Sequence, residues 1–354
     1  MNLPFLPPKK ILSLDLGSYE IKLVEGKSTK DGIVIDNYFS IPTPEDAYID
    51  GKILDKDLIY YILNQEINNR KIKTKNVYLS INSSLIITRE VIIPKVEEEE
   101  IENILKYQIE DYIPMYPKDY IVQFKTIGPI YEEGIEKLNI LLIAIPKNIV
   151  ENHFQLIKDL DLNPLILDYQ PNSVAKLIKN NTLNHSYSID SLTCSTVDLG
   201  YDSTKIAIIR DGNIMVSRII DMGMKHIDQN ISNFFNYNKR ELEERKAEIE
   251  NITYMKSEDD DYNKLLNIIK SSLENLNDRI EMVFRYYLTR ERGNEINTIL
   301  LYGGGSKISG ISDFFVNYFN IPSIVIQSFD NVKFDGEIHK YINSIGTIIR
   351  NIEV

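Results

Sequence analysis

A chain of 354 residues is longer than one hydrophobic core usually supports, so two or more domains are expected. Hydrophobic residues make up 43% and charged residues 26%, which is typical of a globular protein and argues against general disorder. The net charge of −12 disfavours nucleic-acid binding, and the one cysteine, Cys194, excludes an intramolecular disulfide or a cysteine metal site. The single cysteine fits a reducing, cytoplasmic setting. Because no apolar run approaches the ~20 residues that span a bilayer, the sequence predicts no transmembrane segment of its own.

The first predicted element is a strand–turn–strand at residues 11–32, ILSLDLGSYEIKLVEGKSTKDG. Its first strand ends in Asp-Leu-Gly, and Asp-Gly at its end favours a second tight turn, since glycine tolerates positive φ. A glycine at such a bend exposes backbone N–H groups that can hold phosphate oxygens, and an aspartate beside it can hold a hydrated Mg²⁺. The candidate ligands here are Asp15, Gly17, Ser18 and Lys22.

Residues 1–88 are predicted to form a mixed sheet with a helix, and residues 89–164 an inserted small domain. The insertion contains an amphipathic helix, whose apolar stripe is Ile101, Ile104, Leu105, Ile109 and Tyr112. Glu97–Glu100 fall in the first turn of that helix, where the helix dipole favours negative charge. We interpret this acidic run as a solvated helix start rather than as an interaction surface.

Residues 195–212, STVDLGYDSTKIAIIRDG, repeat the first segment. Asp198, Gly200 and Lys205 align with the aspartate, glycine and lysine of the first copy, and another Asp-Gly turn follows. One copy alone is a common hairpin start, but two copies with a matching lysine favour a phosphate-binding pair. Tyr201 and Asp202 stand where smaller residues would suit a phosphate, so the second hairpin is expected to grip less tightly. The candidate ligands of this copy are Asp198, Gly200, Ser203 and Thr204.

Residues 224–295 are predicted to form a helical insertion. Its long apolar stripe covers fewer than four heptads, which indicates core packing rather than a coiled coil. A buried strand, Thr298–Tyr302, then leads into Gly303-Gly304-Gly305-Ser306. Three consecutive glycines allow the backbone to approach a flat ligand or a phosphate closely. A flexible surface loop is the alternative for this run.

These three segments, in this order, resemble the phosphate-1, phosphate-2 and adenosine motifs of the superfamily of actin, heat-shock chaperones and sugar kinases. Residues 165–178 are similar to its first connecting motif, which implies that Gln170 orients the attacking water. Residues 344–351 are similar to the second connecting helix, with Gly346 at the crossing. The resemblance implies an α/β, actin-like (ribonuclease H-like, duplicated) two-lobed fold with an inserted small α+β domain. In the first lobe, residues 1–88 are expected to be completed by residues 165–191 and 340–354, and residues 89–164 to form the inserted domain. In the second lobe, residues 192–223 are expected to be completed by residues 296–339, and residues 224–295 to form a helical domain.

Residues 89–124 and 137–171 resemble PilM-like type IV pilus assembly proteins, which are relatives of the cell-division protein FtsA. The resemblance implies an ATP- and Mg-binding scaffold, at most a weak ATPase, peripheral at the inner face of the cell membrane. Its expected partners are the cytoplasmic N-terminal tail of a PilN-like membrane protein and other pilus platform proteins. Mg²⁺ would be held through water by Asp15 and Asp198, and the adenosine bracketed by Glu243, Lys246, Gly303, Gly304, Gly305 and Ser306. A hydrophobic edge between the insertion and residues 33–88 is the expected groove for the partner's peptide.

Two alternatives stay open. An FtsA-like membrane-associated division protein would be expected to carry an amphipathic helix after the last motif, and the sequence stops almost on the connecting helix. A small-molecule kinase of the sugar type would need polar sugar-binding residues near the cleft, and residues 89–164 show no such set. The four histidines show no metal-ligand spacing, and Cys194 is interpreted as a packing residue.

Overall fold

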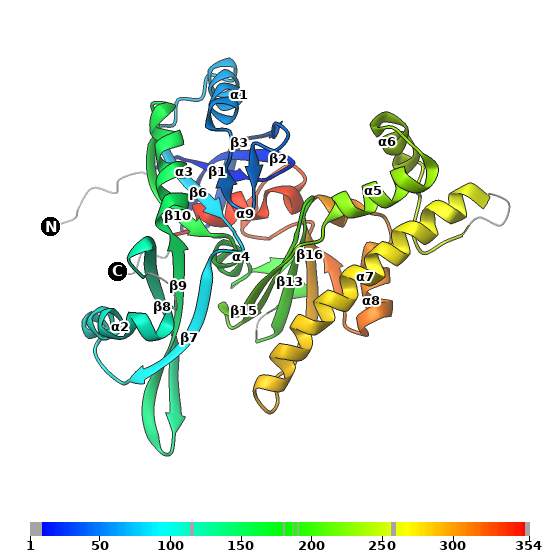
Figure 1. Ribbon diagram of the computed structural model, residues 1–354. Coiled ribbons are helices and arrows are strands. Elements are labelled where there is room, and N and C mark those ends of the chain that lie inside the picture. Colours follow the sequence, from blue (N-terminus) through cyan, green and yellow to red (C-terminus); the bar gives the residue numbers. More distant parts are fainter. Residues whose placement is uncertain are drawn as a thin grey trace.

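Two mixed sheets that share an arrangement of five strands form the centres of two lobes, and the sheet of lobe I has one further edge strand (Figure 1). The computed structural model describes residues 9–113, 117–179, 181–185, 187–189, 191–255 and 260–350. The sheet of lobe I has the order β10-β6-β1-β2-β3-β18, and that of lobe II the order β15-β14-β13-β16-β17. Three antiparallel strands followed by two parallel ones therefore occur in both lobes. The repeat predicted from sequence is a structural duplication.

The strands predicted at residues 11–32, 195–212 and 298–302 are confirmed as β1, β2, β13, β14 and β16. In lobe I they are β1 (Ile11–Leu16), β2 (Glu20–Thr29), β3 (Gly32–Pro42), β6 (Asn76–Ile81), β10 (Asn163–Tyr169) and β18 (Val332–Lys333). In lobe II they are β13 (Thr193–Leu199), β14 (Thr204–Arg210), β15 (Asn213–Ile220), β16 (Thr298–Tyr302) and β17 (Ser323–Val325). Short pairs complete the set: β4 (Tyr48–Ile49) with β5 (Lys52–Ile53), and β11 (Thr182–Leu183) with β12 (Tyr187–Ser188). The apolar runs of β1 and β13 are buried throughout, as strands covered on both faces require.

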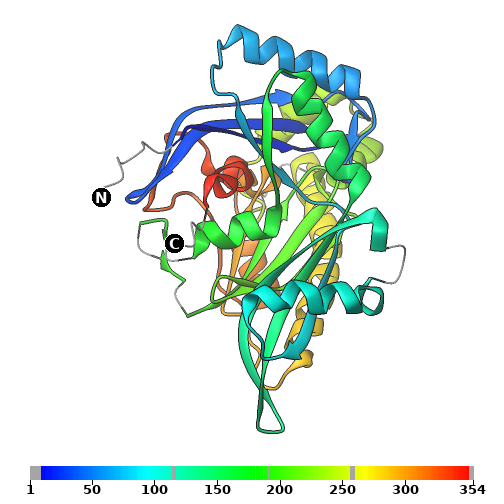
Figure 2. The same ribbon diagram turned by 90° about the vertical axis from the view of Figure 1, so that its left-hand side faces the viewer.

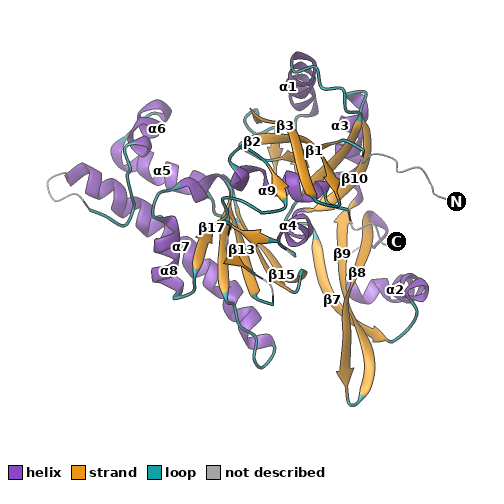
Figure 3. Cartoon of the chain, turned by 180° about the vertical axis from the view of Figure 1, so that it is seen from behind, coloured by secondary structure: helices purple, strands orange, loops and turns teal. Residues whose placement is uncertain are grey.

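Helices cover both faces of each sheet. In lobe I, α1 (Lys56–Asn69) and α3 (Lys147–Asp159) share a core with the apolar side chains of β1 and β2. In lobe II, α5 (Met224–Phe235), α7 (Asp260–Arg290) and α8 (Ile311–Phe319) pack on one sheet face (Figure 3). The predicted stripe of α7 is confirmed as core packing, with Ile269, Leu273, Leu276, Ile280 and Phe284 all buried. The short α6 (Lys239–Ala247) lies beyond α5.

One hydrophobic core lies between the lobes and joins them. It contains α4 (Gln170–Ile178) and α9 (Ile338–Ile348) together with residues from both sheets, among them Val24 and Ile209. The two helices cross at Gly346, as predicted, where an added Cβ would lie 2.2 Å from the carbonyl oxygen of Ser173. Only glycine permits this close approach, so the crossing fixes how the lobes meet at the base of the cleft.

The insertion forms a small unit with its own core. Its sheet has the order β7-β9-β8, built from β7 (Ile87–Pro94), β8 (Tyr120–Glu132) and β9 (Ile135–Pro146). The predicted amphipathic helix is α2 (Glu98–Tyr112), which lies across this sheet and buries Ile101 and Leu105 (Figure 2). In contrast, α3 and β10 belong to lobe I. The domain boundaries remain a prediction, and we propose that the insertion ends near Pro146 rather than at residue 164.

The insertion also contacts lobe II. The guanidinium of Arg290, at the end of α7, donates two hydrogen bonds of 3.2 and 2.8 Å to the carboxylate of Glu90 in β7. The ammonium of Lys125 in β8 donates to the carbonyl oxygen of Gly212, 3.2 Å away, in the β14–β15 turn. The insertion is therefore continuous in chain with lobe I but held to lobe II by side-chain contacts. Within the described ranges, no helix combines the length and apolarity that crossing a bilayer requires.

His153 is a core residue. Its imidazole is fully buried between α3 and β4, where Nδ1 lies 2.8 Å from the carbonyl oxygen of Ile149 and Nε2 3.3 Å from the hydroxyl of Tyr48. Burial disfavours the charged imidazolium and lowers the pKa of His153 to about 4.

This lowered pKa predicts a loss of stability in mild acid. An imidazole in the unfolded chain titrates near pH ~6.5, so as the pH falls the unfolded state binds the proton first. The contribution of His153 is complete above about pH 6.5 and is lost towards pH 4, which amounts to about 2 kcal/mol between pH 7.5 and pH 5. Urea unfolding at these two pH values should show that much less pH dependence in His153→Gln. His185→Gln, at a side chain 86% exposed, is the control; equal pH dependence in all three proteins would contradict the prediction.

Candidate functional site

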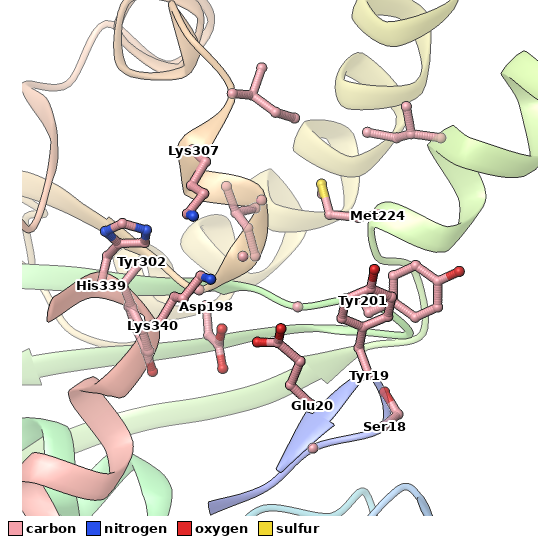
Figure 4. Close-up of a pocket in the computed structure, with 18 of the residues that line it drawn as sticks. Ser18, Tyr19, Glu20, Asp198, Tyr201, Met224, Tyr302, Lys307, His339 and Lys340 are labelled. Atoms are coloured by element: carbon pink, nitrogen blue, oxygen red, sulfur yellow. The ribbon is translucent and has the colours of Figure 1, made fainter. Parts of the chain in front are cut away.

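A cavity of about 590 Å³ lies between the two hairpin loops that carry the repeated Asp-Leu-Gly. Its walls come from the β1–β2 and β13–β14 loops, from α5, α6 and α7, from the glycine loop after β16, and from α9 (Figure 4). Most of the predicted site residues line it: Asp15, Gly17, Ser18, Lys22, Gln170, Asp198, Gly200, Glu243, Lys246, Gly303, Gly304 and Gly305. The fold thus brings together segments as far apart in sequence as Asp15 and Asn343.

Each hairpin places one aspartate opposite one lysine. Asp15 is the register partner of Lys22, and Asp198 that of Lys205, so the two pairs are structurally equivalent. The lysine Nζ lies 4.0 Å from the carboxylate of Asp15 in the first pair and 3.3 Å from that of Asp198 in the second. Burial alone would lower the pKa of Lys205, but the carboxylates of Asp198 and Asp15 outweigh burial and leave the pKa raised. The pairs keep opposite charges in place beside the cavity.

The glycines of the two bends are needed in the same way. An added Cβ at Gly17 would lie 2.8 Å from the carbonyl oxygen of Glu20, and one at Gly200 would lie 2.6 Å from that of Ser203. Both distances are shorter than a normal van der Waals contact, so a larger residue at either position would force the bend open. Because the backbone packs closely at both glycines, the two hairpins are structurally equivalent, which supports their interpretation as a phosphate-binding pair.

Two side chains hold the carboxylate of Asp15. The amide Nε2 of Gln170, at the first turn of α4, donates to Asp15 Oδ1 over 2.7 Å, and Asn343 Nδ2 of α9 donates to Asp15 Oδ2 over 3.4 Å. The buried Oε1 of Gln170 has no hydrogen-bond partner in the part of the chain that the structure describes. An unsatisfied buried acceptor that borders a cavity is suited to accept from a water or ligand. Asn343 was missed from the sequence because it precedes the matched motif by one residue.

The glycine loop approaches the second aspartate. Gly303 has φ +84°, its N–H donates to the carbonyl oxygen of His339 over 2.9 Å, and an added Cβ would lie 2.2 Å from Asp198 Oδ1. A 3₁₀ turn, Gly304–Lys307, follows directly. Ser306 does not line the cavity, since its hydroxyl donates to the carbonyl oxygen of Gly303 within that turn.

Two further predicted residues also lie outside the cavity lining. Thr204 is buried, and its hydroxyl donates to the carbonyl oxygen of Met222 over 2.8 Å. Successive residues of a strand point to opposite faces, so with Lys205 directed to the cavity Thr204 is directed away. Ser203 lies before β14 and lines no part of the cavity. Ser203, Thr204 and Ser306 therefore do not face the cavity that the other predicted ligands line.

The end of the cavity away from the aspartates is apolar. Its walls are formed by Met224, Ile227, Ile231, Ala247, Ile249, Ile269 and Ile308. At its edge, the ammonium of Lys246 donates to Asp228 over 2.8 Å and to Glu243 over 3.2 Å. Burial raises the pKa of Asp228 even though Lys246 acts in the opposite direction. Asp228 lies 18 residues before Lys246 on a different helix, so no sequence motif revealed it.

Substitution of two adjacent glycines in this loop should have different effects on stability. Gly303→Ala requires both a left-handed backbone and a clash with Asp198, and it should lower the free energy of unfolding by about 1–3 kcal/mol. Gly304→Ala, one residue on, meets nothing within 4 Å and should be almost neutral. Denaturant unfolding without added ligand measures both, and equal stabilities for the two variants would show that the close approach is not real.

Comparisons with known proteins identify the family and the fold of this chain. The family model for type IV pilus assembly protein PilM matches residues 13–343. A solved structure of a PilM–PilN type IV pilus biogenesis complex superposes with a TM-score of 0.76 at 19% identity, over 98% of this chain and 100% of that one. The ethanolamine utilization protein EutJ from Carboxydothermus hydrogenoformans gives 0.58 at 14% identity, covering 97% and 90% of the two chains. MreB5 of Spiroplasma citri bound to ADP gives 0.54 at 15%, covering 96% and 95%. These likenesses confirm the predicted actin-like fold. Because the family match spans nearly the whole sequence, the chain belongs to the family of type IV pilus assembly protein PilM.

Proposed function

We propose that the protein is an ATP-binding scaffold of the type IV pilus assembly platform, acting at the cytoplasmic face of the membrane. The observation that carries the nucleotide part is the pair of equivalent Asp–Lys units, one from each lobe, facing one cavity. The family match carries the pilus part. It favours this function over an FtsA-like division protein and over a sugar-type kinase.

The cavity matches the two chemical ends of ATP. The bends at Gly17 and Gly200 would face the phosphates, with Lys22 and Lys205 as cations, and the apolar end would accept the base between Met224 and Ile308. Within the described residues, no three His, Cys, Asp or Glu side chains gather closely enough to hold a metal directly. Asp15 and Asp198 would therefore hold Mg²⁺ through water, as hydrated Mg²⁺ commonly is held. When bound, Mg²⁺ would neutralise phosphate charge.

The hydrogen bonds to Asp15 and Asp198 favour a site that retains nucleotide over one that hydrolyses it rapidly. Asp15 accepts hydrogen bonds from Gln170 and Asn343, and Asp198 accepts one from Lys205, so both carboxylates are held in place. Gln170, with its unsatisfied Oε1, is the residue we propose to orient a water. We therefore expect nucleotide to act as a structural ligand or switch, with slow hydrolysis at most.

Thermal unfolding tests the nucleotide proposal. A ligand at about 100 times its Kd stabilises a protein by about 2.7 kcal/mol, so Mg-ATP should raise the melting temperature of the wild type by several degrees. Asp15→Ala should lose this shift, because the substitution removes one metal-linked carboxylate. Asp57→Ala, on the exposed side of α1, should keep it. An unchanged melting temperature in the wild type would refute nucleotide binding.

We further propose that the cytoplasmic tail of a PilN-like membrane protein binds between the insertion and lobe I. Ile49, at the end of β4, and Leu85, just before β7, are 40% and 38% exposed. They are brought near each other by Asp50, whose carboxylate accepts the N–H of Ser84 over 2.8 Å. β7 is an edge strand of its sheet, and an edge beside apolar side chains suits capture of an extended peptide. Binding to other platform proteins remains a broader expectation.

Fluorescence anisotropy with a labelled tail peptide from the neighbouring pilus membrane protein tests this site. Ile49→Asp and Leu85→Asp should each weaken binding at least tenfold, because each places an unpaired charge in an apolar contact. Tyr107→Asp provides the control, since Tyr107 lies on α2 and is 91% exposed. If the peptide binds all four proteins equally, the groove is elsewhere; if it binds none, the partner is wrong while the fold stands.

A further inference from the structure

The two hairpin loops touch through a pair of aromatic rings. Tyr19, in the β1–β2 loop of lobe I, and Tyr201, in the β13–β14 loop of lobe II, have ring centroids 4.6 Å apart at an interplanar angle of 41°. Figure 4 shows the two rings side by side at the edge of the cavity, near Ser18. Aromatic pairs favour offset or tilted arrangements at this separation. The contact therefore joins a loop of lobe I to a loop of lobe II.

Each tyrosine is fixed to its own lobe by the backbone. The carbonyl oxygen of Tyr19 accepts the N–H of Thr43, just after β3, over 2.9 Å. The carbonyl oxygen of Tyr201 accepts the N–H of Lys225, in the first turn of α5, over 2.9 Å. Gly223 approaches so closely that an added Cβ would lie 2.2 Å from the Tyr201 carbonyl oxygen. With both loops held in this way, the lobes cannot part at this end of the cavity unless the rings separate.

The two tyrosines lie next to the bends that face the phosphates. Tyr19 is two residues beyond Gly17, and Tyr201 directly follows Gly200. Tyr19 is 47% exposed, so the pair borders solvent at the edge of the cavity. Burial raises the pKa of the Tyr201 hydroxyl, and Asp228 acts in the same direction, so this hydroxyl is neutral near pH 7.

We propose that Tyr19 and Tyr201 form an aromatic clasp that holds the two lobes closed over the phosphate end and slows nucleotide release. The release part rests on the proposed function, whereas the closure part concerns the protein without ligand. A ring on only one loop has no partner, so losing either tyrosine should open the clasp as fully as losing both.

Release kinetics provide the first test. A fluorescent ATP analogue is bound with Mg²⁺ and displaced by excess ATP in a stopped-flow experiment. Tyr19→Ala and Tyr201→Ala should each release it about three- to tenfold faster, the range that loss of one aromatic pair implies. The double variant should be no faster than either single one, and Tyr19→Phe, which keeps the ring, should resemble the wild type. Tyr107→Ala is the matched control on exposed α2.

A distance measurement without nucleotide provides the second test. Spin labels are placed at Tyr61→Cys on α1 and Arg240→Cys on α6, which stand at the outer ends of the two lobes (Figure 1). The native Cys194 will not compete for label, since it is buried and burial raises the pKa of its thiol to about 12. Tyr19→Ala and Tyr201→Ala should each shift the label-to-label distance to longer values, and Tyr19→Phe should not.

The two tests separate the possible failures. Unchanged distances, or release effects that multiply in the double variant, would mean that each tyrosine acts alone, and the clasp would be rejected. If the wild type shows no thermal shift with Mg-ATP, nucleotide binding fails, and the distances alone decide closure. If the wild type binds Mg-ATP but all variants release the analogue at its rate, nucleotide binding stands and the clasp falls.

Discussion

The site depends on one constraint, the register of two antiparallel hairpins. Asp15 opposite Lys22 and Asp198 opposite Lys205 are cross-strand neighbours, so one side chain of each sign is placed at the same height on the same sheet face. A slip of one residue in either hairpin would turn its aspartate to the opposite face and bury a lysine among apolar side chains. The fully buried apolar residues of β1 and β13 prevent that slip. The charge arrangement is therefore a consequence of hydrophobic packing along the strands.

The lobes are held together differently at the two ends of the cleft. At the base, α4 and α9 share a continuous core with both sheets and cross tightly at Gly346, so separation there would expose a large apolar surface. At the edge of the cavity, the described contact between the hairpin loops is one aromatic pair, which costs far less to part. A strong base and a weak rim are the conditions for hinge motion about the base. Gln170 and Asn343 lie on α4 and α9 and donate hydrogen bonds to Asp15, so we expect these bonds to persist when the lobes move about the base.

Much of this fold could be predicted from the sequence because it follows from local patterns that occur twice. Asp-Leu-Gly, a lysine five residues beyond the glycine and a later Asp-Gly turn define each hairpin, and Asp211 and Gly212 both adopt the positive φ that such a turn requires. The end of the insertion was harder to predict. The apolar run of β10 reads equally well as a return strand of the small domain, and only its parallel pairing with β6 assigns it to lobe I.

The site residues that belong to local sequence motifs could be predicted. Those that reach the site only through packing between distant segments could not. Lys205 and Thr204 are neighbours in a strand, so their side chains point to opposite faces of the sheet. The sequence shows that they differ in this way, but only the strand register shows which of the two faces the cavity. Asp228 reaches Lys246 only because α5 and α6 pack side by side, and no spacing rule spans that gap. Tyr201 is the clearest case. From sequence alone its bulk counted against the second hairpin as a phosphate loop. In the folded protein the ring points to Tyr19 on the other lobe, so the same bulk becomes the contact between the loops.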